Sequence, residues 1–503
     1  MMERGHRDEA GNAFFKWLDR ADKNPVIGAV SMDSLNEQAV LHILRSCRLT
    51  PFARYWRSRE RTYLYHSLSQ KKFCGSAALC DILDLLSIEP ESRRLEYAMS
   101  GACDTEALSM LKTNGFLVDR DVNPLIDLKA FQDACAGMDE RFSVLFLFLT
   151  HRCNLRCEYC LGLRGASAST PSMDGGTALR ALSLFRSLGR REKATVVLYG
   201  GEPLLNRDVL RIAVENIRDC ESGSASGTDI ELFTNGTLIS AEVADFMKRY
   251  NVRPVISIDG TEARHDAFRR GPRGGRSFRA AVRGYNTLKK RGLHPAISCV
   301  VGAHNVDSLY ESVSFFLNRL EAREIRFYPV KGLSSESHSG TAPGDFAAQI
   351  TGIYPLLRKN RVADNIFQPL MMRLSLERIS RKSCSAYGGQ LSVMPDGSAG
   401  PCINMAEEYR CLWGSVHDAS IENSIVGRSS GSLFLRRSPF FREDCRNCMA
   451  IALCGGGCIH EGLVRHGDFL GKDAVHCGMM KALLPRAVEM LFEEAAAYRQ
   501  GRH

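Results

Sequence analysis

The sequence predicts an α/β protein in which parallel strands are covered by helices. Between residues 140 and 330, strand-like apolar runs alternate with helical runs, which is the pattern of repeated β–α units. Cysteines at metal-ligand spacings follow the first of these strands and recur in the last quarter of the chain. A length of 503 residues is too great for one ordinary core and leaves room for about three domains.

The alternating region contains six expected strands and five expected helices. The strands are 144–150, 195–199, 229–233, 254–258, 296–301 and 325–330. The helices are 177–188, 208–218, 241–249, 278–290 and 306–320. Six units are too few to close an eight-stranded barrel, and in sheets of this kind ligands sit at the carboxyl ends of the strands.

The composition is that of a soluble globular protein, with 44% hydrophobic and 24% charged residues. The first residues, Met1 to Glu9, are too charged for a signal peptide, and no apolar run approaches the roughly 18 residues that span a membrane. We therefore expect a cytoplasmic protein with no membrane contact. In a chain without an export signal, the 18 cysteines favour metal over disulfides.

The strongest local signal is the CxxxCxxC loop formed by Cys153, Cys157 and Cys160, directly after the apolar run 144–149. Three thiolates in one short loop can hold three irons of a [4Fe-4S] cluster and leave the fourth iron open for chemistry. Structural zinc is the alternative, but it prefers four closed ligands from paired CxxC turns.

This loop, with Tyr159 just before its last cysteine, resembles the cluster loop of the radical S-adenosylmethionine (SAM) enzymes. In that family SAM chelates the open iron, and its reductive cleavage gives a 5′-deoxyadenosyl radical that takes a hydrogen atom from the substrate. The resemblance implies a partial (β/α)6 radical SAM barrel over residues 140–330, with Tyr159 near the cofactor.

A glycine-rich turn follows the second expected strand as Gly200, Gly201, Glu202 and Pro203. Two glycines let a backbone come close to a ligand, and a carboxylate accepts hydrogen bonds from an ammonium group. In the family this GGEP element binds the amino group of SAM. An ordinary strand-to-helix turn is the structural alternative.

Further SAM contacts are expected after the third and fourth strands. The run 234–237 matches the family's TNG loop and supplies Asn235. Ser257 and Asp259 share one strand face by alternation, which suits the ribose or methionine groups of SAM. Arg269 or Arg270 is expected to pair with the SAM carboxylate. For these arginines, and for the nearby His265 and Asp266, a surface or capping role is the alternative.

Residues 1–135 carry few motifs. Helices are expected at 35–44, 77–86 and 106–112, and strands at 62–68 and 115–118. This order resembles the winged-helix peptide-recognition domain of radical SAM peptide maturases, in which a leader peptide adds as a strand to a sheet edge. A packing domain that covers one end of the barrel is the alternative.

The last quarter of the chain holds a second cysteine pattern, C-x12-G-x4-C followed by C-x2-C-x5-C-x3-C and a final cysteine. It matches the seven-cysteine SPASM pattern of radical SAM enzymes that act on peptides and proteins. We expect a bridging region at 331–383 with helices at 345–357 and 369–379, a SPASM domain at 384–480, and a C-terminal helix within 481–503.

The resemblance implies two auxiliary [4Fe-4S] clusters, and so three clusters in all. One would be fully ligated, and its ligands are Cys445, Cys448, Cys454 and Cys477. The other would be held by Cys384, Cys402 and Cys458, with Cys411 as the candidate for its fourth ligand or an open iron in its place. In sulfatase-maturating members an Asp follows the cysteine equivalent to Cys402, whereas here that residue is Ile403, which argues against formylglycine formation.

Together these patterns predict a radical SAM enzyme that crosslinks a ribosomal precursor peptide through a thioether or carbon–carbon bond. The expected partners are the precursor peptide, with its leader on the N-terminal domain, and a reductase, flavodoxin or ferredoxin as electron donor. Oxidation or epimerisation of a protein or small molecule is the alternative within enzymes. A zinc-ribbon nucleic-acid-binding protein is the alternative outside them, but the Lys and Arg residues behind the net charge of +9 are scattered, so no nucleic-acid partner is expected.

Overall fold

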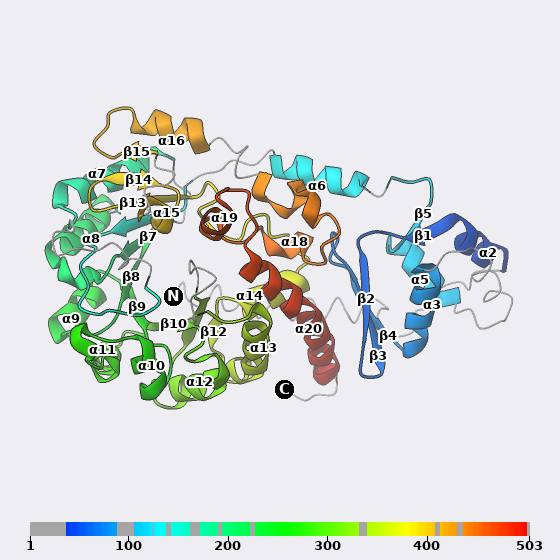
Figure 1. Cartoon of the computed structure of the whole chain (residues 1–503), viewed down its shortest axis with the longest axis horizontal. Helices are drawn as coiled ribbons and strands as arrows, with labels where there is room; N and C mark the ends of the chain where they lie inside the picture. The colour runs from blue at the N-terminus through cyan, green and yellow to red at the C-terminus, as the bar shows by residue number, and fades with distance from the viewer. Residues whose placement is uncertain are drawn as a thin grey trace.

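The computed structural model describes residues 37–87, 105–123, 125–136, 142–160, 172–189, 194–221, 227–330, 340–407, 413–429 and 436–499. Within these ranges a ten-stranded sheet organises the chain, and an antiparallel module built from the N-terminal residues lies at the opposite end (Figure 1). In the same ranges, no helix combines the length and apolarity needed to cross a membrane.

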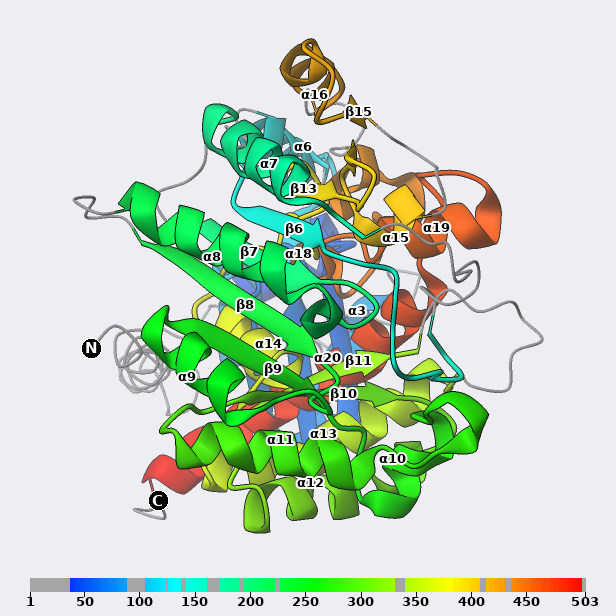
Figure 2. The ribbon, with the colours of Figure 1, turned by 90° about the vertical axis from the view of Figure 1, so that its left-hand side faces the viewer.

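Six parallel strands follow one another through the sheet in chain order, as the sequence predicts. They are β6 (Val144–Phe148), β7 (Ala194–Tyr199), β8 (Thr228–Thr234), β9 (Val252–Ser257), β10 (Ala296–Val301) and β11 (Glu324–Pro329). Figure 2 shows these strands with helices packed over them. β6, β7 and β10 consist mostly of apolar residues because helices and other side chains cover them, whereas β8, β9 and β11 also carry charged residues such as Glu231 and Arg326.

Helices separate the strands. They are α7 (Gly175–Ser187), α8 (Arg207–Glu221), α9 (Ala241–Arg249), α10 (Glu262–Phe268), α11 (Phe278–Lys290) and α12 (Leu309–Asn318). Side-chain caps fix two of the starts, where Asp174 accepts from the Thr177 amide and Ser240 from the Val243 amide. The short helix α10 was not predicted, and the expected helix 306–320 is divided into a 3-10 turn, η4 (Val306–Ser308), and α12.

The sheet continues beyond the six predicted strands at both edges. β12 (Ala363–Asp364) pairs with β11, and β13 (Gln390–Val393) pairs in parallel with β6. The antiparallel strands β14 (Ser398–Gly400) and β15 (Gly414–Ser415) follow β13. The first strands of the cysteine-rich segment therefore belong to the same sheet as the barrel, a join that the sequence did not indicate because these strands have two to four residues.

The N-terminal module has two small antiparallel sheets. One contains β2 (Ala53–Ser58), β3 (Arg61–His66) and β4 (Lys72–Gly75), and the other pairs β1 (Cys47–Leu49) with β5 (Leu117–Asp119). Its helices are α2 (Glu37–Ser46), α3 (Ala77–Ser87) and α5 (Thr105–Thr113), and α6 (Ile126–Ala136) leads out of it. Sequence analysis found β3, β5 and the three helices but missed β1, β2 and β4.

Three helices connect the barrel to the N-terminal module and the cysteine-rich segment. They are α13 (Pro343–Lys359), α14 (Phe367–Ser375) and the C-terminal α20 (Ala474–Arg499). α20 packs against α13, α14 and β3, and its long ribbon runs between barrel and module in Figure 1. It begins seven residues before the predicted start at 481, so Cys477 lies in its first turn and Pro485 lies within it rather than near its start.

The remaining short elements lie mostly in the cysteine-rich segment. The helices are α15 (Ile403–Glu407), α16 (Ile421–Ser429), α18 (Ile451–Cys454) and α19 (Ile459–His466). The 3-10 turns are η2 (Pro203–Leu205), η3 (Pro272–Gly274), η5 (Pro439–Phe441) and η6 (Glu443–Cys445).

α11 packs closely on the loop after β8, which predicts that Gly284 of α11 does not tolerate a side chain. A Cβ on Gly284 would lie 2.0 Å from the Gly236 carbonyl oxygen, whereas a Cβ on Gly352, in the exposed part of α13, meets nothing within 4 Å. We expect Gly284→Ala to destabilise the protein by about 1–3 kcal/mol through overpacking. The control Gly352→Ala should be neutral or stabilise by up to about 1 kcal/mol. Urea unfolding measures both, and equal effects would contradict the packing.

A buried carboxyl in α20 predicts a pH dependence of stability. Burial raises the pKa of Glu494 to about 7 from its ordinary 4.5, although Arg358, with its Nε 3.0 Å from Oε1, lowers it. Between these two pKa values the unfolded chain ionises this group while the folded chain keeps it protonated. Stability therefore falls as pH rises through this window, by at most about 3 kcal/mol.

Replacing Glu494 by Gln should remove that part of the fall, which unfolding free energies at pH 5 and pH 8 will measure. The matched control is Glu493→Gln, because Glu493 is the more exposed neighbour and pairs with Arg486. If Glu494→Gln and wild type lose the same stability between the two pH values, Glu494 is not the group responsible.

Candidate cofactor and cluster sites

The loop after β6 brings Cys153, Cys157 and Cys160 together at the carboxyl end of the parallel sheet. Burial raises the pKa of the Cys157 thiol to about 12; Arg269 lowers it, and Cys160 and Cys153 raise it again. The three thiols are therefore close enough to act on one another. The Leu155 amide also donates to Cys153 Sγ at 3.4 Å, which is a contact that stabilises a thiolate.

Gly200 and Gly201 serve the cysteine loop itself rather than leaving space for a ligand. A Cβ on Gly200 would lie 2.6 Å from the Thr150 carbonyl oxygen, and one on Gly201 would lie 2.5 Å from the Arg152 carbonyl oxygen. Gly200 also has a φ of 153°, in the region that favours glycine. These glycines let the β7 turn pack against the chain that leads into the cysteines, and their expected close approach to a cofactor stays a prediction.

Glu202 is fully buried, and its carboxylate is occupied by the protein. It accepts from the Leu204 amide at 3.1 Å, the Thr234 hydroxyl at 2.7 Å and the Asn235 amide at 2.8 Å. Burial raises its pKa, and these donors act in the opposite direction. The carboxylate therefore holds the turn after β8, and its expected contact with a ligand ammonium group stays a prediction. Pro203 begins η2 and is buried beside it.

Asn235 and Asn154 connect the turn after β8 to the cysteine loop. The Asn235 side-chain amide donates to Asn154 Oδ1 at 2.8 Å, and the Asn154 amide donates to the Thr237 hydroxyl at 2.8 Å. Asn154 lies between Cys153 and Cys157, yet sequence analysis did not assign it a role. Its position inside the cysteine motif was the feature of the sequence that could have indicated a role.

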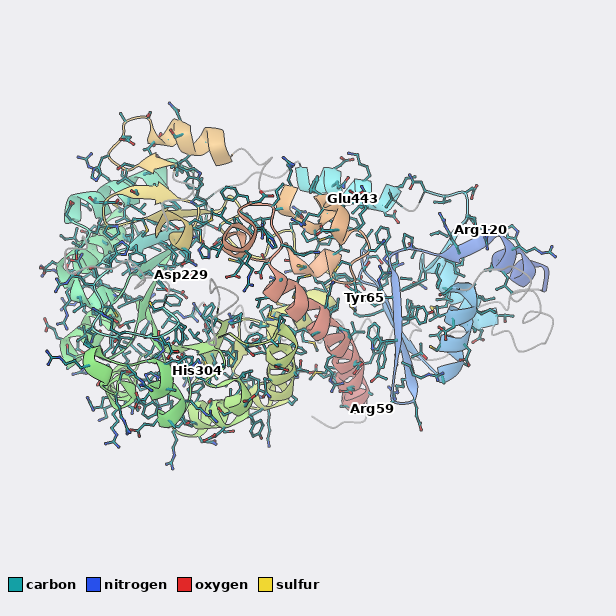
Figure 3. The ribbon with its side chains drawn as sticks, viewed as in Figure 1. Arg59, Tyr65, Arg120, Asp229, His304 and Glu443 are labelled. Atoms are coloured by element: carbon teal, nitrogen blue, oxygen red, sulfur yellow. The ribbon has the colours of Figure 1, made fainter. Side chains whose placement is uncertain are left out.

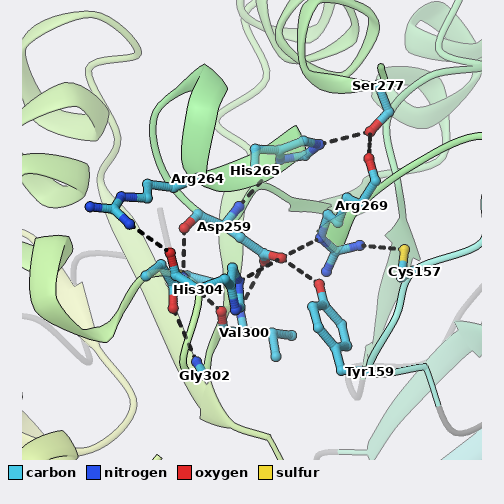
Figure 4. Close-up of polar contacts among 12 residues, drawn as sticks. Cys157, Tyr159, Asp259, Arg264, His265, Arg269, Ser277, Val300, Gly302 and His304 are labelled. Atoms are coloured by element: carbon cyan, nitrogen blue, oxygen red, sulfur yellow. Dashed lines mark hydrogen bonds and ion pairs between the residues drawn. The ribbon is translucent and has the colours of Figure 1, made fainter. Parts of the chain in front are cut away.

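Asp259 is the centre of a second buried network beside the cysteine loop (Figure 4). Its carboxylate accepts from Arg269 Nε at 2.9 Å, from the Val300 amide at 3.0 Å and from the Tyr159 hydroxyl, and it lies 3.6 Å from His304 Nε2. Burial alone would raise the pKa of Asp259, but Arg269 and the histidines hold it well below its ordinary range.

The structure distinguishes the two candidate arginines. Arg269 is buried, stacks over Tyr159 with its guanidinium carbon 5.4 Å from the ring centroid, and donates through Nη1 to Cys157 Sγ at 3.9 Å. Arg270 is exposed and donates to the Asp266 carbonyl. Of this pair, only the Arg269 side chain contacts a cysteine among the described residues, while the Arg270 carbonyl accepts from the Arg156 amide at 2.6 Å.

The other polar residues of this stretch have structural positions. Asp266 accepts from the Ser277 and Phe278 amides at 2.9 Å, so it caps α11, and His265 is buried against Ser277. Ser257 ends β9 and is half-buried opposite Ser298 of β10, whereas Asp259 lies two residues beyond with its carboxylate in the network above. The capping alternative is thus right for Asp266.

His304, which sequence analysis missed, completes the Asp259 network. It is buried in the turn after β10 and stacks on Phe268 at a centroid distance of 4.3 Å and on Tyr159 at 5.7 Å. A single histidine in a loop carries no sequence signal, and only the fold brings it beside the cysteine loop.

The C-terminal cysteines form two groups. Burial raises the pKa of Cys454 to about 12, and Cys448, Cys445 and Cys477 raise it further. Burial likewise raises the pKa of Cys402 to about 12, and Cys458 and Cys384 add to it. These neighbours are cysteines that the SPASM resemblance groups together, and their ligation of clusters stays a prediction. Cys411 lies outside the described residues.

Arg437 and three consecutive glycines hold the second group in place. Arg437 is buried, and it donates to the Tyr387 hydroxyl at 2.7 Å and to the Cys458 carbonyl at 2.6 Å. A Cβ on Gly455 would lie 2.4 Å from the Ser383 amide nitrogen, so this glycine lets the turn pack against the residue next to Cys384. Nothing in the sequence distinguishes Arg437 from the many other scattered arginines.

These thiol groups fit iron–sulfur clusters. Among the described residues no three His, Cys, Asp or Glu side chains converge closely enough for a single metal ion. In a cubane each cysteine ligates a different iron, so convergence on one point is not required. Backbone amides donate to the sulfurs, as Ala386 does to Cys384 at 3.5 Å, and such donors stabilise cluster thiolates.

Comparison with known proteins agrees with this chemistry. Residues 147–316 match the radical SAM superfamily. The chain is 22% identical over 373 residues to the radical SAM cyclopropyl synthase TigE of Paramaledivibacter caminithermalis, covering 70% of this chain and 75% of TigE. It is 25% identical over 385 residues to a cysteine-type anaerobic sulfatase-maturating enzyme of Clostridium novyi, covering 71% and 99%.

Solved structures share the fold. The enzyme anSMEcpe with bound AdoMet superimposes with a TM-score of 0.61 at 20% identity, covering 71% of this chain and 99% of that one. SuiB of Streptococcus suis bound to its precursor peptide SuiA gives a TM-score of 0.52 at 14% identity, covering 85% and 99%. With the cysteine loop at the carboxyl end of its parallel sheet, residues 147–316 of this chain form a radical SAM domain.

Proposed function

We propose that this radical SAM enzyme modifies a ribosomally made precursor peptide and forms an intramolecular thioether or carbon–carbon crosslink. The observation that carries the proposal is the CxxxCxxC loop directly after β6 in the domain that matches the radical SAM superfamily, with seven further cysteines of the expected pattern in the C-terminal segment. A bound cluster at the first group would supply the electron that cleaves SAM, whose adenosyl radical then takes a hydrogen atom from the peptide.

Cys153, Cys157 and Cys160 would hold the radical-generating cluster. The protein residues around it would seat SAM, and the proposed set is Tyr159, Gly200, Gly201, Glu202, Pro203, Asn235, Ser257, Asp259 and Arg269. Glu202 and Asp259 act by position: each is buried and fixes a loop that borders the cysteines. Arg269 is the proposed partner of the SAM carboxylate, because its guanidinium faces the cysteine loop.

Two auxiliary clusters are proposed in the SPASM segment, with the ligand sets Cys445, Cys448, Cys454 and Cys477, and Cys384, Cys402 and Cys458. Whether Cys411 completes the second set decides if one iron stays open to substrate. These clusters would accept an electron from the product radical or hold the peptide. A reductase, flavodoxin or ferredoxin would donate the electrons.

The N-terminal module is the proposed leader-binding domain. Its three-stranded sheet has β2 at one edge and β4 at the other, and an extended peptide can add to a sheet edge through main-chain hydrogen bonds. The SuiB structure with its precursor peptide supports this proposal, because the shared fold covers 85% of this chain.

Formylglycine formation is not proposed, despite the likeness to sulfatase-maturating enzymes. Ile403 follows Cys402 and begins α15, where the sulfatase-maturating members have an Asp. An apolar side chain cannot accept a proton, so the base that those members use is missing at this position.

The proposed chemistry predicts iron content and SAM cleavage. The full chain, reconstituted anaerobically with iron and sulfide, should hold about twelve irons, at four per cubane. With SAM and dithionite it should release 5′-deoxyadenosine. Replacing Cys153, Cys157 and Cys160 by Ala should abolish release and remove about four irons. Cys220→Ala, an exposed cysteine of α8, is the control and should change neither.

Three outcomes of that experiment would count against the proposal. Bound zinc without SAM cleavage favours a zinc-ribbon protein. About four irons with cleavage retained means that the C-terminal cysteines do not hold clusters. Cleavage that persists without any peptide modification, when candidate precursor peptides are supplied, favours oxidation or epimerisation of another substrate.

The Asp259 network predicts a large, specific loss of stability. Asp259→Asn leaves the buried Arg269 charge without its partner, which costs about 3–5 kcal/mol. It should also weaken SAM binding, because Arg269 and Tyr159 lose their common acceptor. Replacing Arg269 by Met in the same chain should recover part of the stability, because no unpaired charge then remains buried.

Unfolding in urea and equilibrium SAM binding check this prediction. Asp266→Asn is the control: it weakens the cap of α11, which costs about 1 kcal/mol, and should leave SAM affinity unchanged. Equal stability of Asp259→Asn and wild type would show that the ion pair does not hold this region.

A further inference from the structure

The N-terminal module is attached directly to the segment that carries Cys445, Cys448 and Cys454. Phe52 and Leu68 of the module form a small apolar cluster with Phe440, Ile451 and Ala452. Ile451 and Ala452 belong to α18, between Cys448 and Cys454. Ala450 and Leu453, on either side of these two residues, pack into the main core together with Tyr65, so this segment contacts both the module and the barrel.

The sheet of the module places a cation against the turn between two of these cysteines. Arg54 of β2 donates to the carbonyl of Asn447, which lies between Cys445 and Cys448. It also donates to the Pro51 carbonyl at 2.7 Å, so two contacts hold its guanidinium in place. Burial lowers the pKa of Arg54, and the Cys448 thiolate raises it, which indicates that charge and thiolate are neighbours.

Tyr65 of β3 is the cross-strand partner of Arg54. Its side chain is fully buried on the side of the sheet that faces α20, where Figure 3 labels it. Among the described residues its hydroxyl has no hydrogen-bond partner, which is costly for a buried group. Burial raises the pKa of Tyr65. Tyr65 belongs to the main apolar core, and Cys448 packs against that same core.

We infer that Arg54 and Tyr65 of the N-terminal module set the reduction potential of the cluster held by Cys445, Cys448, Cys454 and Cys477. This inference rests on the proposed function, because it needs that cluster. Arg54 supplies a fixed positive charge beside the turn between Cys445 and Cys448. Tyr65 supplies a buried O–H that no protein group among the described residues accepts, so it would be available to donate to a bound cluster. Both are positioning residues that act on the cluster from outside its ligand shell.

The direction of the effect follows from charge. Each one-electron reduction makes a cluster more negative, so a nearby cation and a hydrogen bond to sulfur stabilise the reduced form and raise the potential. The other charges beside Tyr65 form a pair of opposite sign, since Lys72 Nζ lies 3.6 Å from Glu377 Oε1. That pair carries no net charge, so it does not cancel the charge of Arg54. Arg54 is the cation of β2 that acts on Cys448.

The test is a redox titration of the reconstituted full chain, followed by electron paramagnetic resonance. Cys153, Cys157 and Cys160 are replaced by Ala to remove one signal, and the signal lost on Cys477→Ala identifies the four-cysteine cluster. Arg54→Met and Tyr65→Phe should each shift its potential to more negative values. Arg54→Lys keeps the charge and should therefore keep the potential close to the wild-type value.

Two matched controls come from the same strands. Arg57→Met removes a β2 cation that pairs with Asp81 and donates to the Ala77 carbonyl, away from the cysteines. Tyr63→Phe removes a hydroxyl from the same face of β3, where the ring stacks on Trp56. Neither control should change the potential.

Unchanged potential in both Arg54→Met and Tyr65→Phe, with full iron content, would overturn this inference and leave the proposed function intact. Equal shifts in the controls would also overturn it, because they would indicate a general loosening of the module. A chain that holds no iron at the C-terminal cysteines would overturn both. Should Arg54→Met fail to fold, the more conservative Tyr65→Phe still decides the question.

Discussion

Two buried carboxylates, Glu202 and Asp259, organise the carboxyl end of the parallel sheet. Each has no exposed surface, and each spends its oxygens on protein donors from neighbouring loops. Glu202 joins the turns after β7 and β8, and Asp259 joins the turns after β9 and β10 to the cysteine loop. A buried carboxylate is stable only when its oxygens accept hydrogen bonds from the protein. The loops that supply these donors are therefore held in one arrangement.

The cysteine loop gains its shape from this arrangement rather than from its own sequence. Gly200 and Gly201 admit its backbone at distances that a Cβ would block, Asn154 ties it to the turn after β8, and Arg269 contacts its middle cysteine. An open cluster needs this rigidity, because a cofactor that completes the coordination must approach from one side. The surrounding residues therefore prepare the site before any cofactor binds.

The cysteine-rich segment is joined to the rest of the molecule at two places. β13 extends the barrel sheet beside β6, and the apolar cluster around Phe440 joins the segment to the N-terminal module. Figure 1 shows α18 and α19 of the segment between the barrel and the N-terminal module, whereas β14, β15 and α16 lie beside the barrel. The segment therefore borders both the barrel and the sheet that we propose as the peptide-binding site.

Much of this architecture is readable from the sequence, because its signals are local. The six strands alternate with amphipathic helices, and the cysteine spacings resemble a family pattern whose ligand groups stay predictions. The short strands β12 to β15 escaped notice because two to four residues carry no periodicity. The motifs drew attention to Gly200, Glu202 and Asp259, but a motif does not show which protein atoms a residue contacts. Asn154, His304 and Arg437 act through contacts between distant segments, which spacing does not reveal.

Anomalous diffraction at the iron edge, from crystals of the anaerobically reconstituted chain, tests the central claim most directly. The account predicts three separate iron sites: one beside Cys153, Cys157 and Cys160, one beside Cys445, Cys448, Cys454 and Cys477, and one beside Cys384, Cys402 and Cys458. Iron missing from the loop after β6, or a signal at the zinc edge in its place, would contradict it.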